Sequence, residues 1–319
     1  MSADGAAHPG TALRSVASTA KAWDVDHVRF RVPDPDAQEA FLRDFGLTPT
    51  RADGALLGLA SDGTAPYRAE AGEPAFLGFG LRVPDEGALD ALAERGGVRC
   101  TDRGAAAVAL TDPNGWEVRA VLRAADVPAP GAPRNEAGIA ARGLGRHAPP
   151  QGPSEVLRLG HVVLRVADFA ASRRFYEDHF GLLASDEVTG LDEETVVGAF
   201  FRCDRGAQAT DHHSVFLMQS PDARPEFEHA AFEVRDIDSL MAGHDHLDRA
   251  GHRHAWGVGR HVLGAHVFDY WRDPAGFELE HWTDGDVLDA SDPVGRHPIP
   301  VLLGAQWGPA HPMTREQAE

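Results

Sequence analysis

Two stretches of the sequence decide the fold: DHVRFRVPDPDAQEAFLRDFGL at residues 26–47 and GHVVLRVADFAASRRFYEDHFGL at residues 160–182. Each contains a histidine at the start of an alternating apolar segment, which is typical of a strand. Each then passes through an aspartate into an amphipathic segment that ends at Phe-Gly-Leu. An internal repeat of this kind indicates that the chain is built from two related halves.

Two further pairs of segments extend the repeat. FLGFGLRVPD (76–85) aligns with FEHAAFEVRD (227–236), and TDPNGWEVRAV (111–121) aligns with RDPAGFELEHW (272–282). The helical stretches that follow the first pair both end at glycines, which suit helix C-termini. We therefore predict an α+β fold of two domains, each made of two βαβββ modules whose mixed sheets curl into a cup.

The repeats also set the predicted domain boundaries. We expect an N-terminal extension, a degenerate domain without metal, a connection rich in Ala, Pro, Gly and Arg, a catalytic metal-binding domain and a C-terminal tail. Their ranges are 1–22, 23–123, 124–154, 155–286 and 287–319.

Composition narrows the class of protein. The formal net charge of −19 would repel phosphate backbones, so nucleic acid is not an expected partner. No stretch approaches the ~18 uncharged apolar residues that a membrane span needs, and the N-terminus lacks an apolar core behind a basic start. We expect a cytoplasmic protein with no membrane partner. Cys100 and Cys203 form no CxxC pair, which argues against a thiolate metal site.

The two halves differ at three aligned strand positions. The second half has His161, His229 and Glu280 where the first half has His27, Gly78 and Arg119. Arginine cannot ligate a cation, so a metal is expected only in the C-terminal domain. Two histidines and one carboxylate form the ligand set of non-heme iron(II) oxygenases, which leaves coordination positions open for substrate and oxygen. The three residues are remote along the chain, and only a curled sheet would bring them together.

The run GRHVLGAHVFDYWRDPAGFELE (259–280) resembles the signature of type I extradiol dioxygenases of the vicinal oxygen chelate superfamily, such as catechol 2,3-dioxygenase and biphenyl-2,3-diol dioxygenase. In that signature a histidine is followed by a tyrosine, then by Asp-Pro, a glycine and a glutamate ligand. Asp269 departs from it, because the family usually has an apolar residue there. Strand alternation places Asp269 on the face opposite Tyr270, so we expect it to affect packing more than chemistry.

The resemblance implies an Fe(II)-dependent enzyme that cleaves the ring of a substituted catechol with O2 to a muconic semialdehyde-type product. The metal ligands that it implies are His161, His229 and Glu280. Mn(II) uses the same ligands and is an alternative to iron. Relatives commonly form tetramers or larger assemblies, so a homo-oligomer is expected.

It also implies the catalytic groups. His213, the second histidine of DHHS, resembles the acid–base histidine beside the bound oxygen. His212 is the alternative, because strand alternation would send the two to opposite faces. His261 and Tyr270 resemble groups that hydrogen-bond the catechol oxygens. His266 shares a strand face with Tyr270, but a direct contact with substrate is not its expected role.

Structural roles are expected for the remaining histidines and for the repeated Asp-Pro pairs. His27 is interpreted as a remnant of duplication, and Asp112 and Asp273 as turn formers. The histidines in or after the last predicted helix are expected to be solvated, namely His244, His246, His252 and His254.

Two other functions stay open. One is a different metal-dependent enzyme of the superfamily, a glyoxalase-like isomerase or an epimerase, which would need a further carboxylate ligand but not His213, His261 and Tyr270. The other is a non-catalytic protein that binds an aromatic ligand. Open coordination positions argue against it, since sequestration does not need them.

Overall fold

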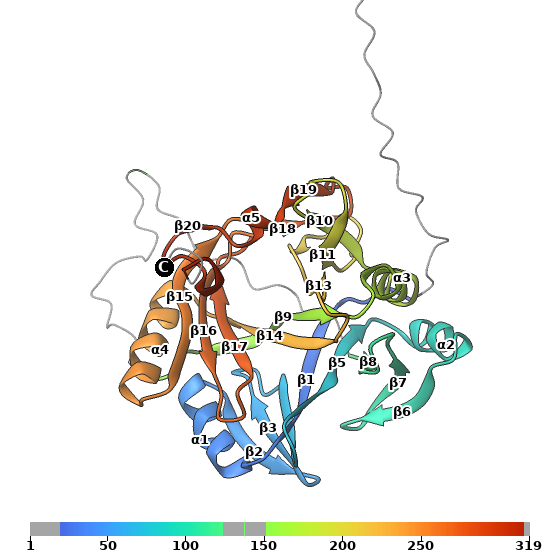
Figure 1. The fold of residues 1–319 in the computed structure, drawn as a ribbon. Coiled ribbons are helices and arrows are strands. Elements are labelled where there is room, and N and C mark those ends of the chain that lie inside the picture. The colour runs from blue at the N-terminus through green and yellow to red at the C-terminus, as the bar shows by residue number, and fades with distance from the viewer. Residues whose placement is uncertain (1–19, 124–136, 138–150, 316–319) are drawn as a thin grey trace, which may run out of the picture.

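The computed structural model describes residues 20–123, residue 137 and residues 151–315. These residues form four successive βαβββ units, two in each half, which confirms the predicted α+β architecture (Figure 1). Most of the predicted connection at 124–154 and of the extension at 1–22 lies outside the described residues. Within the described part of the chain, no helix has the length and apolarity needed to cross a membrane.

The first half contains two units in sequence. The first is β1 (Asp24–Val32), α1 (Pro35–Phe45), β2 (Thr48–Ala52), β3 (Ala55–Leu59) and β4 (Tyr67–Ala71). The second is β5 (Ala75–Val83), α2 (Glu86–Glu94), β6 (Val98–Asp102), β7 (Ala105–Thr111) and β8 (Glu117–Leu122).

The second half repeats this order with a small additional strand. Its first unit is β9 (Val156–Val166), α3 (Phe169–Phe180), β10 (Leu183–Thr189), β11 (Val196–Arg202), β12 (Thr210–Asp211) and β13 (Val215–Gln219). Its second is β14 (Glu226–Val234), α4 (Ile237–Arg249), β15 (Arg253–His261), β16 (Val267–Arg272) and β17 (Glu278–Thr283).

The residues after Asp286 are integrated into the second half. They form β18 (Val287–Leu288), β19 (Gly295–Pro298), α5 (Ile299–Leu302), β20 (Ala305–Trp307) and α6 (Pro312–Arg315). Strand β19 pairs with β10 at one edge of the large sheet, and β20 pairs with β15 at the other. The segment predicted as a tail at 287–319 therefore closes both edges of the sheet.

Each half is built around one mixed sheet. The first has the order β2-β3-β4-β1-β5-β8-β7-β6, and the second has the order β19-β10-β11-β13-β9-β14-β17-β16-β15-β20. In both sheets the first strands of the two units pair antiparallel at the centre, as β1 with β5 and β9 with β14. This arrangement places the first strand of each unit beside its counterpart, where their side chains share a face.

The repeated aspartates begin the helices. Asp34, Asp85, Asp168 and Asp236 are the N-cap residues of α1, α2, α3 and α4, and each side chain accepts a hydrogen bond from a backbone N–H of the first turn. Helix α1 ends at Gly46, whose φ of 101° is a left-handed conformation that glycine adopts without strain.

The two halves pack through a shared apolar core, and the hydrogen bonds between them include a reciprocal pair. The ring of Phe30 lies 4.6 Å from that of Phe277 across the contact. The Tyr176 hydroxyl of α3 donates to Asp112 at 3.1 Å, and the Gln38 amide of α1 donates to Asp273 at 3.0 Å. The Asp-Pro turns predicted from the repeat therefore also join each half to a helix of the other.

Candidate metal centre and active site

Three adjacent strands of the ten-stranded sheet bring the predicted metal-ligating side chains together. His161 lies on β9, His229 on β14 and Glu280 on β17. The register pairs both His161 and Glu280 with Ala231 of β14, two residues beyond His229. Oε2 of Glu280 lies 3.2 Å from Nε2 of His161 and 3.2 Å from Nε2 of His229. The three side chains therefore converge from one face of the sheet.

These three groups fit a divalent cation. Glu280 is fully buried, and neither of its carboxylate oxygens makes a well-aligned hydrogen bond to a described residue. Two ligand atoms that each lie roughly 2.0–2.2 Å from one metal ion are about 3 Å from each other, which matches these separations. Burial alone would raise the pKa of Glu280, but the facing imidazoles of His161 and His229 hold it well below its usual value. A buried carboxylate without a partner is costly, and a bound cation would remove that cost.

His261 and Tyr270 lie together beside this cluster. Nε2 of His261 is 2.9 Å from the phenolic oxygen of Tyr270 and 3.9 Å from Oε1 of Glu280. Burial lowers the pKa of His261 to about 4 and raises the pKa of Tyr270 well above its usual value. Near neutral pH both are uncharged, so Tyr270 keeps its O–H and His261 keeps one lone pair.

His213 completes the group on another side of the cluster. Its ring lies 4.1 Å from that of His161, and it is 4% exposed. Burial lowers its pKa well below the usual value, and the nearby imidazoles of His161 and His266 lower it further. His213 is therefore a neutral imidazole, which can accept a proton at one nitrogen and donate one from the other.

A cavity of about 540 Å³ connects these groups. The imidazoles of the site and the phenol of Tyr270 line it. Apolar side chains from the sheet and from the segment after β19 form part of the remaining wall, namely Val163, Phe200, Phe216, Met218, Trp256, Ile299, Leu302, Leu303 and Met313. Charged side chains line it as well, namely Arg165, Glu228, Arg253, Arg272 and Glu278. The cavity therefore combines polar groups that can orient a ligand with apolar surface, which is typical of a small-molecule site.

Comparison with known proteins agrees with this geometry. Residues 158–281 match the family model described as the glyoxalase/bleomycin resistance protein/dioxygenase superfamily. The chain is 32% identical over 304 residues to metapyrocatechase 2 of Cupriavidus necator, which covers 90% of this chain and 89% of that protein. The chain is an extradiol dioxygenase of this superfamily.

Solved structures support the same fold for the dioxygenase. The Mn(II)-bound glyoxalase from Novosphingobium aromaticivorans superposes with a TM-score of 0.72 at 22% identity, over 92% of this chain and 94% of that one. Homoprotocatechuate 2,3-dioxygenase from Brevibacterium fuscum superposes with a TM-score of 0.69 at 18% identity, over 90% of this chain and 78% of that one. At these identities the likeness establishes the architecture alone.

In the first half, the positions that align with His229 and Glu280 carry no metal-ligating side chain, although Asp26, His27 and Asp102 bring potential ligand atoms together nearby. Gly78, which aligns with His229, has a φ of 132°, and a Cβ there would lie 1.9 Å from the carbonyl oxygen of Glu117. A histidine therefore cannot stand at this position without moving the backbone. Arg119, which aligns with Glu280, instead donates to Asp102 at 3.0 Å.

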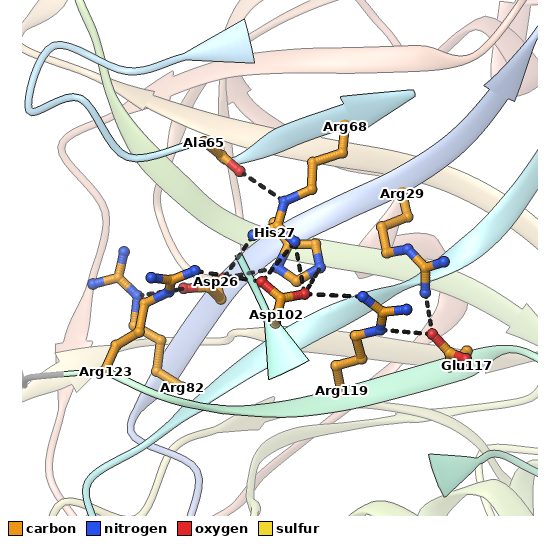
Figure 2. A network of polar contacts seen from close by, with 10 residues as sticks. All are labelled: Asp26, His27, Arg29, Ala65, Arg68, Arg82, Asp102, Glu117, Arg119 and Arg123. Atoms are coloured by element: carbon orange, nitrogen blue, oxygen red, sulfur yellow. Dashed lines mark hydrogen bonds and ion pairs between the residues drawn. The ribbon is translucent and has the colours of Figure 1, made fainter. Parts of the chain in front are cut away.

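A network of charged side chains surrounds Arg119 and Asp102 in the first half (Figure 2). Nδ1 of His27 lies 2.7 Å from Asp26, and Asp102 accepts hydrogen bonds at 2.7 Å from Arg68. The acidic groups face several guanidinium groups, namely Arg68, Arg82, Arg119 and Arg123. Fixed positive side chains thus supply the charge that a cation would supply in the second half.

The four histidines predicted to be solvated are partly exposed, His254 most of all, but each also has an aspartate partner. His244 and His254 hydrogen-bond the fully buried carboxylate of Asp269, at 3.1 and 2.9 Å. His246 and His252 each lie 2.9 Å from Asp44 of α1, in the other half. Asp269 also accepts from the Trp271 indole at 2.6 Å, which places it in packing on the face opposite Tyr270, as expected. The aspartate partners are remote in sequence, so no local pattern indicates them.

The structure also changes the expectations for His212 and His266. His212 and His213 lie outside a regular strand, so strand alternation does not separate them, and both are buried. His266 is 1% exposed, lines the cavity, and neither of its ring nitrogens has a partner among the described residues. The signal in the sequence for a role in the site was its even spacing from Tyr270, although His266 itself lies just before β16.

Proposed function

We propose that the dioxygenase cleaves the aromatic ring of a catechol with O2 beside its two hydroxyl groups, to a muconic semialdehyde-type product. The observation that carries the proposal is the convergence of two imidazoles and one buried carboxylate beside a cavity with a partly apolar wall. In this proposal His161, His229 and Glu280 hold Fe(II), with Mn(II) as the alternative. When bound, the metal supplies positive charge beside the catechol oxygens and a route for electrons between ring and oxygen.

The chain's own groups bind the substrate and move its protons. The Tyr270 hydroxyl and the His261 imidazole, 2.9 Å apart, offer a donor and an acceptor to a catechol oxygen. The neutral imidazole of His213 takes a proton from a substrate hydroxyl and returns it when negative charge develops on oxygen. The apolar wall excludes water, which strengthens these interactions.

The cavity favours a substituted catechol. Its volume of about 540 Å³ exceeds what one small ring fills, and Phe200, Phe216 and Leu302 contribute apolar surface to its wall. An apolar ring substituent would cover this wall, with a gain of roughly 25 cal/mol per Å² buried. We expect catechols with alkyl or aryl substituents to be better substrates than catechol itself.

Anaerobic reconstitution with Fe(II), followed by oxygen and a panel of substituted catechols, tests the proposal. Ring cleavage gives a yellow product whose mass equals that of substrate plus O2. The Glu280→Gln variant should lose this activity, and Glu177→Gln, on α3 and ion-paired with Arg173 away from the cavity lining, should retain it. Absence of product from every catechol, together with turnover of a glyoxalase substrate, would assign the site to the isomerase class.

The homo-oligomeric state is a separate part of the proposal. Sedimentation of the full chain at several concentrations measures it directly. A single species with the mass of one chain at all concentrations would contradict it.

A further inference from the structure

A line of hydrogen bonds leads from the cavity wall through both histidines of the DHHS segment. Nδ1 of His213 lies 3.1 Å from Nδ1 of His212. Nε2 of His212 lies 2.7 Å from Oδ2 of Asp186, and Nε2 of His297 lies 3.2 Å from Oδ1 of the same carboxylate. Three side chains behind the cavity wall are thus connected to His213.

The fold anchors this line at several points. Asp186 lies on β10 and His297 on β19, two strands that pair in parallel at the edge of the sheet (Figure 1). The backbone N–H of His212 donates to the carbonyl of Asp286 at 2.9 Å, and the Ser185 hydroxyl donates to the His212 carbonyl at 2.6 Å. The His212 side chain is only 4% exposed. Its ring therefore has little freedom to leave the line.

The ionisation of Asp186 sets the direction of each hydrogen bond. Burial would raise the pKa of Asp186, but the hydrogen bond with His212 and the nearby His297 lower it below its usual value. A carboxylate only accepts, so His212 donates from Nε2, and a neutral His212 then has a lone pair at Nδ1. The matching donor is Nδ1–H of His213, which leaves Nε2 of His213 without a proton.

We propose that Asp186 and His212 are positioning residues that hold His213 in the tautomer with its hydrogen on Nδ1 and its lone pair on Nε2. Which nitrogen of a histidine carries the proton is set by the hydrogen bond that the other nitrogen makes. His213 lines the cavity, so the Nε2 lone pair is the one available to substrate. This inference rests on the proposed function, in which His213 is the acid–base group.

The tautomer determines how the proton moves. The catechol O–H bond breaks, its electron pair stays on oxygen, and the proton binds Nε2 of His213. The Nδ1–H bond of His213 to His212 is kept, so the ring stays oriented while it is protonated. The opposite tautomer would present an N–H to the substrate hydroxyl and could not accept this proton.

Variants at His212 and Asp186 test the proposal. The His212→Phe variant keeps an aromatic ring at this position but loses the nitrogen that accepts from Nδ1–H of His213. Its kcat should fall roughly 10-fold to 100-fold, with a much smaller change in KM. His212→Gln keeps an acceptor toward His213 and a donor toward Asp186, and should restore most of the loss. Asp186→Asn keeps an acceptor for His212 but removes the negative charge, so its kcat should lie between those of His212→Phe and His212→Gln.

Nitrogen NMR of ¹⁵N-histidine-labelled, metal-free protein gives a readout that does not depend on activity. The wild type should show His213 protonated at Nδ1 and unprotonated at Nε2, and His212→Phe should lose this preference. His246→Phe, which removes another His–Asp hydrogen bond between residues that do not line the cavity, is the matched control and should change neither readout.

Two results would overturn the inference: a wild-type His213 protonated at Nε2, or a His212→Phe enzyme with the kcat of the wild type. If His212→Phe does not fold, the kcat of Asp186→Asn and the nitrogen spectrum of the wild type decide whether the inference holds. If the wild type cleaves no catechol, the proposed function fails, and the spectrum still decides the tautomer.

Discussion

Nε2 of His261 lies 2.9 Å from the phenolic oxygen of Tyr270, and both side chains border the cavity beside Glu280. The two residues are nine positions apart in sequence and come from consecutive strands, β15 and β16. This pair offers a catechol oxygen one donor and one acceptor at a fixed separation.

Replacing Tyr270 by phenylalanine should weaken catalysis and leave the metal in place. The loss of one hydrogen bond to substrate is expected to lower kcat/KM about 10-fold, or about 1.4 kcal/mol. Steady-state kinetics and iron analysis of the same preparation measure both quantities. Tyr67→Phe is the control, because the Tyr67 hydroxyl is buried in the other half and makes no hydrogen bond to a described residue. Loss of iron from Tyr270→Phe would contradict this role.

Removal of the metal should destabilise the wild type but not the Glu280→Gln variant. An ion present at 100 times its dissociation constant stabilises the folded state by about 2.7 kcal/mol, and a chelator removes this term. In the metal-free state the variant should be somewhat less stable than the wild type, since it lacks the attraction of the imidazoles of His161 and His229 that holds the pKa of Glu280 below its usual value. Thermal unfolding with and without chelator measures the difference. An equal effect of chelator on both proteins would place the ion elsewhere.

The Asp273 carboxyl should make unfolding depend on pH. Burial raises its pKa to about 6, above its value in the unfolded chain, so the folded state binds this proton more tightly. The stabilisation is full below about pH 4 and is lost as pH rises through 6, by about 3 kcal/mol.

Asp273→Asn should remove this pH dependence and keep the hydrogen bond from Gln38, since its amide oxygen still accepts. The free energy of unfolding between pH 4 and 7, measured for the wild type and the variant, isolates the effect. Asp222→Asn, at an exposed position, is the control. Parallel curves for wild type and Asp273→Asn would show that the carboxyl has an ordinary pKa.

The ion network of the first half should matter for stability and not for metal binding. Arg68→Met leaves Asp102 buried with fewer cationic partners, and we expect a loss of about 3 kcal/mol in unfolding free energy (Figure 2). Arg29→Met, at a more exposed pair with Glu117, should cost less than about 1 kcal/mol. Iron content per folded chain should be unchanged in both. A drop in iron content with Arg68→Met would show that the two halves are coupled at the metal.

Much of the architecture could be predicted from the repeat. Four copies of an alternating segment, an aspartate and an amphipathic helix specify four βαβββ units, because strand and helix periods are local properties of the sequence. Alignment of the copies also singled out His161, His229 and Glu280, since residues at the same position in paired units share a face of the sheet.

Strand alternation failed where the backbone is irregular. His212 and His213 were expected on opposite faces of a strand. The backbone bends there instead, and both rings are buried with their Nδ1 atoms 3.1 Å apart. The same limitation applies to the segment after Asp286, whose short strands complete the sheet only by pairing with strands about 50 to 110 residues earlier.

The sequence by itself thus determined the units, their order and the difference between a half with ligands and a half with Gly78 and Arg119. Tertiary structure alone decided the partners of these polar side chains: Asp186 for His212, Asp269 for His244 and His254, and Asp102 for Arg68. The physical reason is that hydrophobic periodicity acts over a few residues along the chain, whereas a buried charge is satisfied by whatever group the folded chain places within about 3 Å of it.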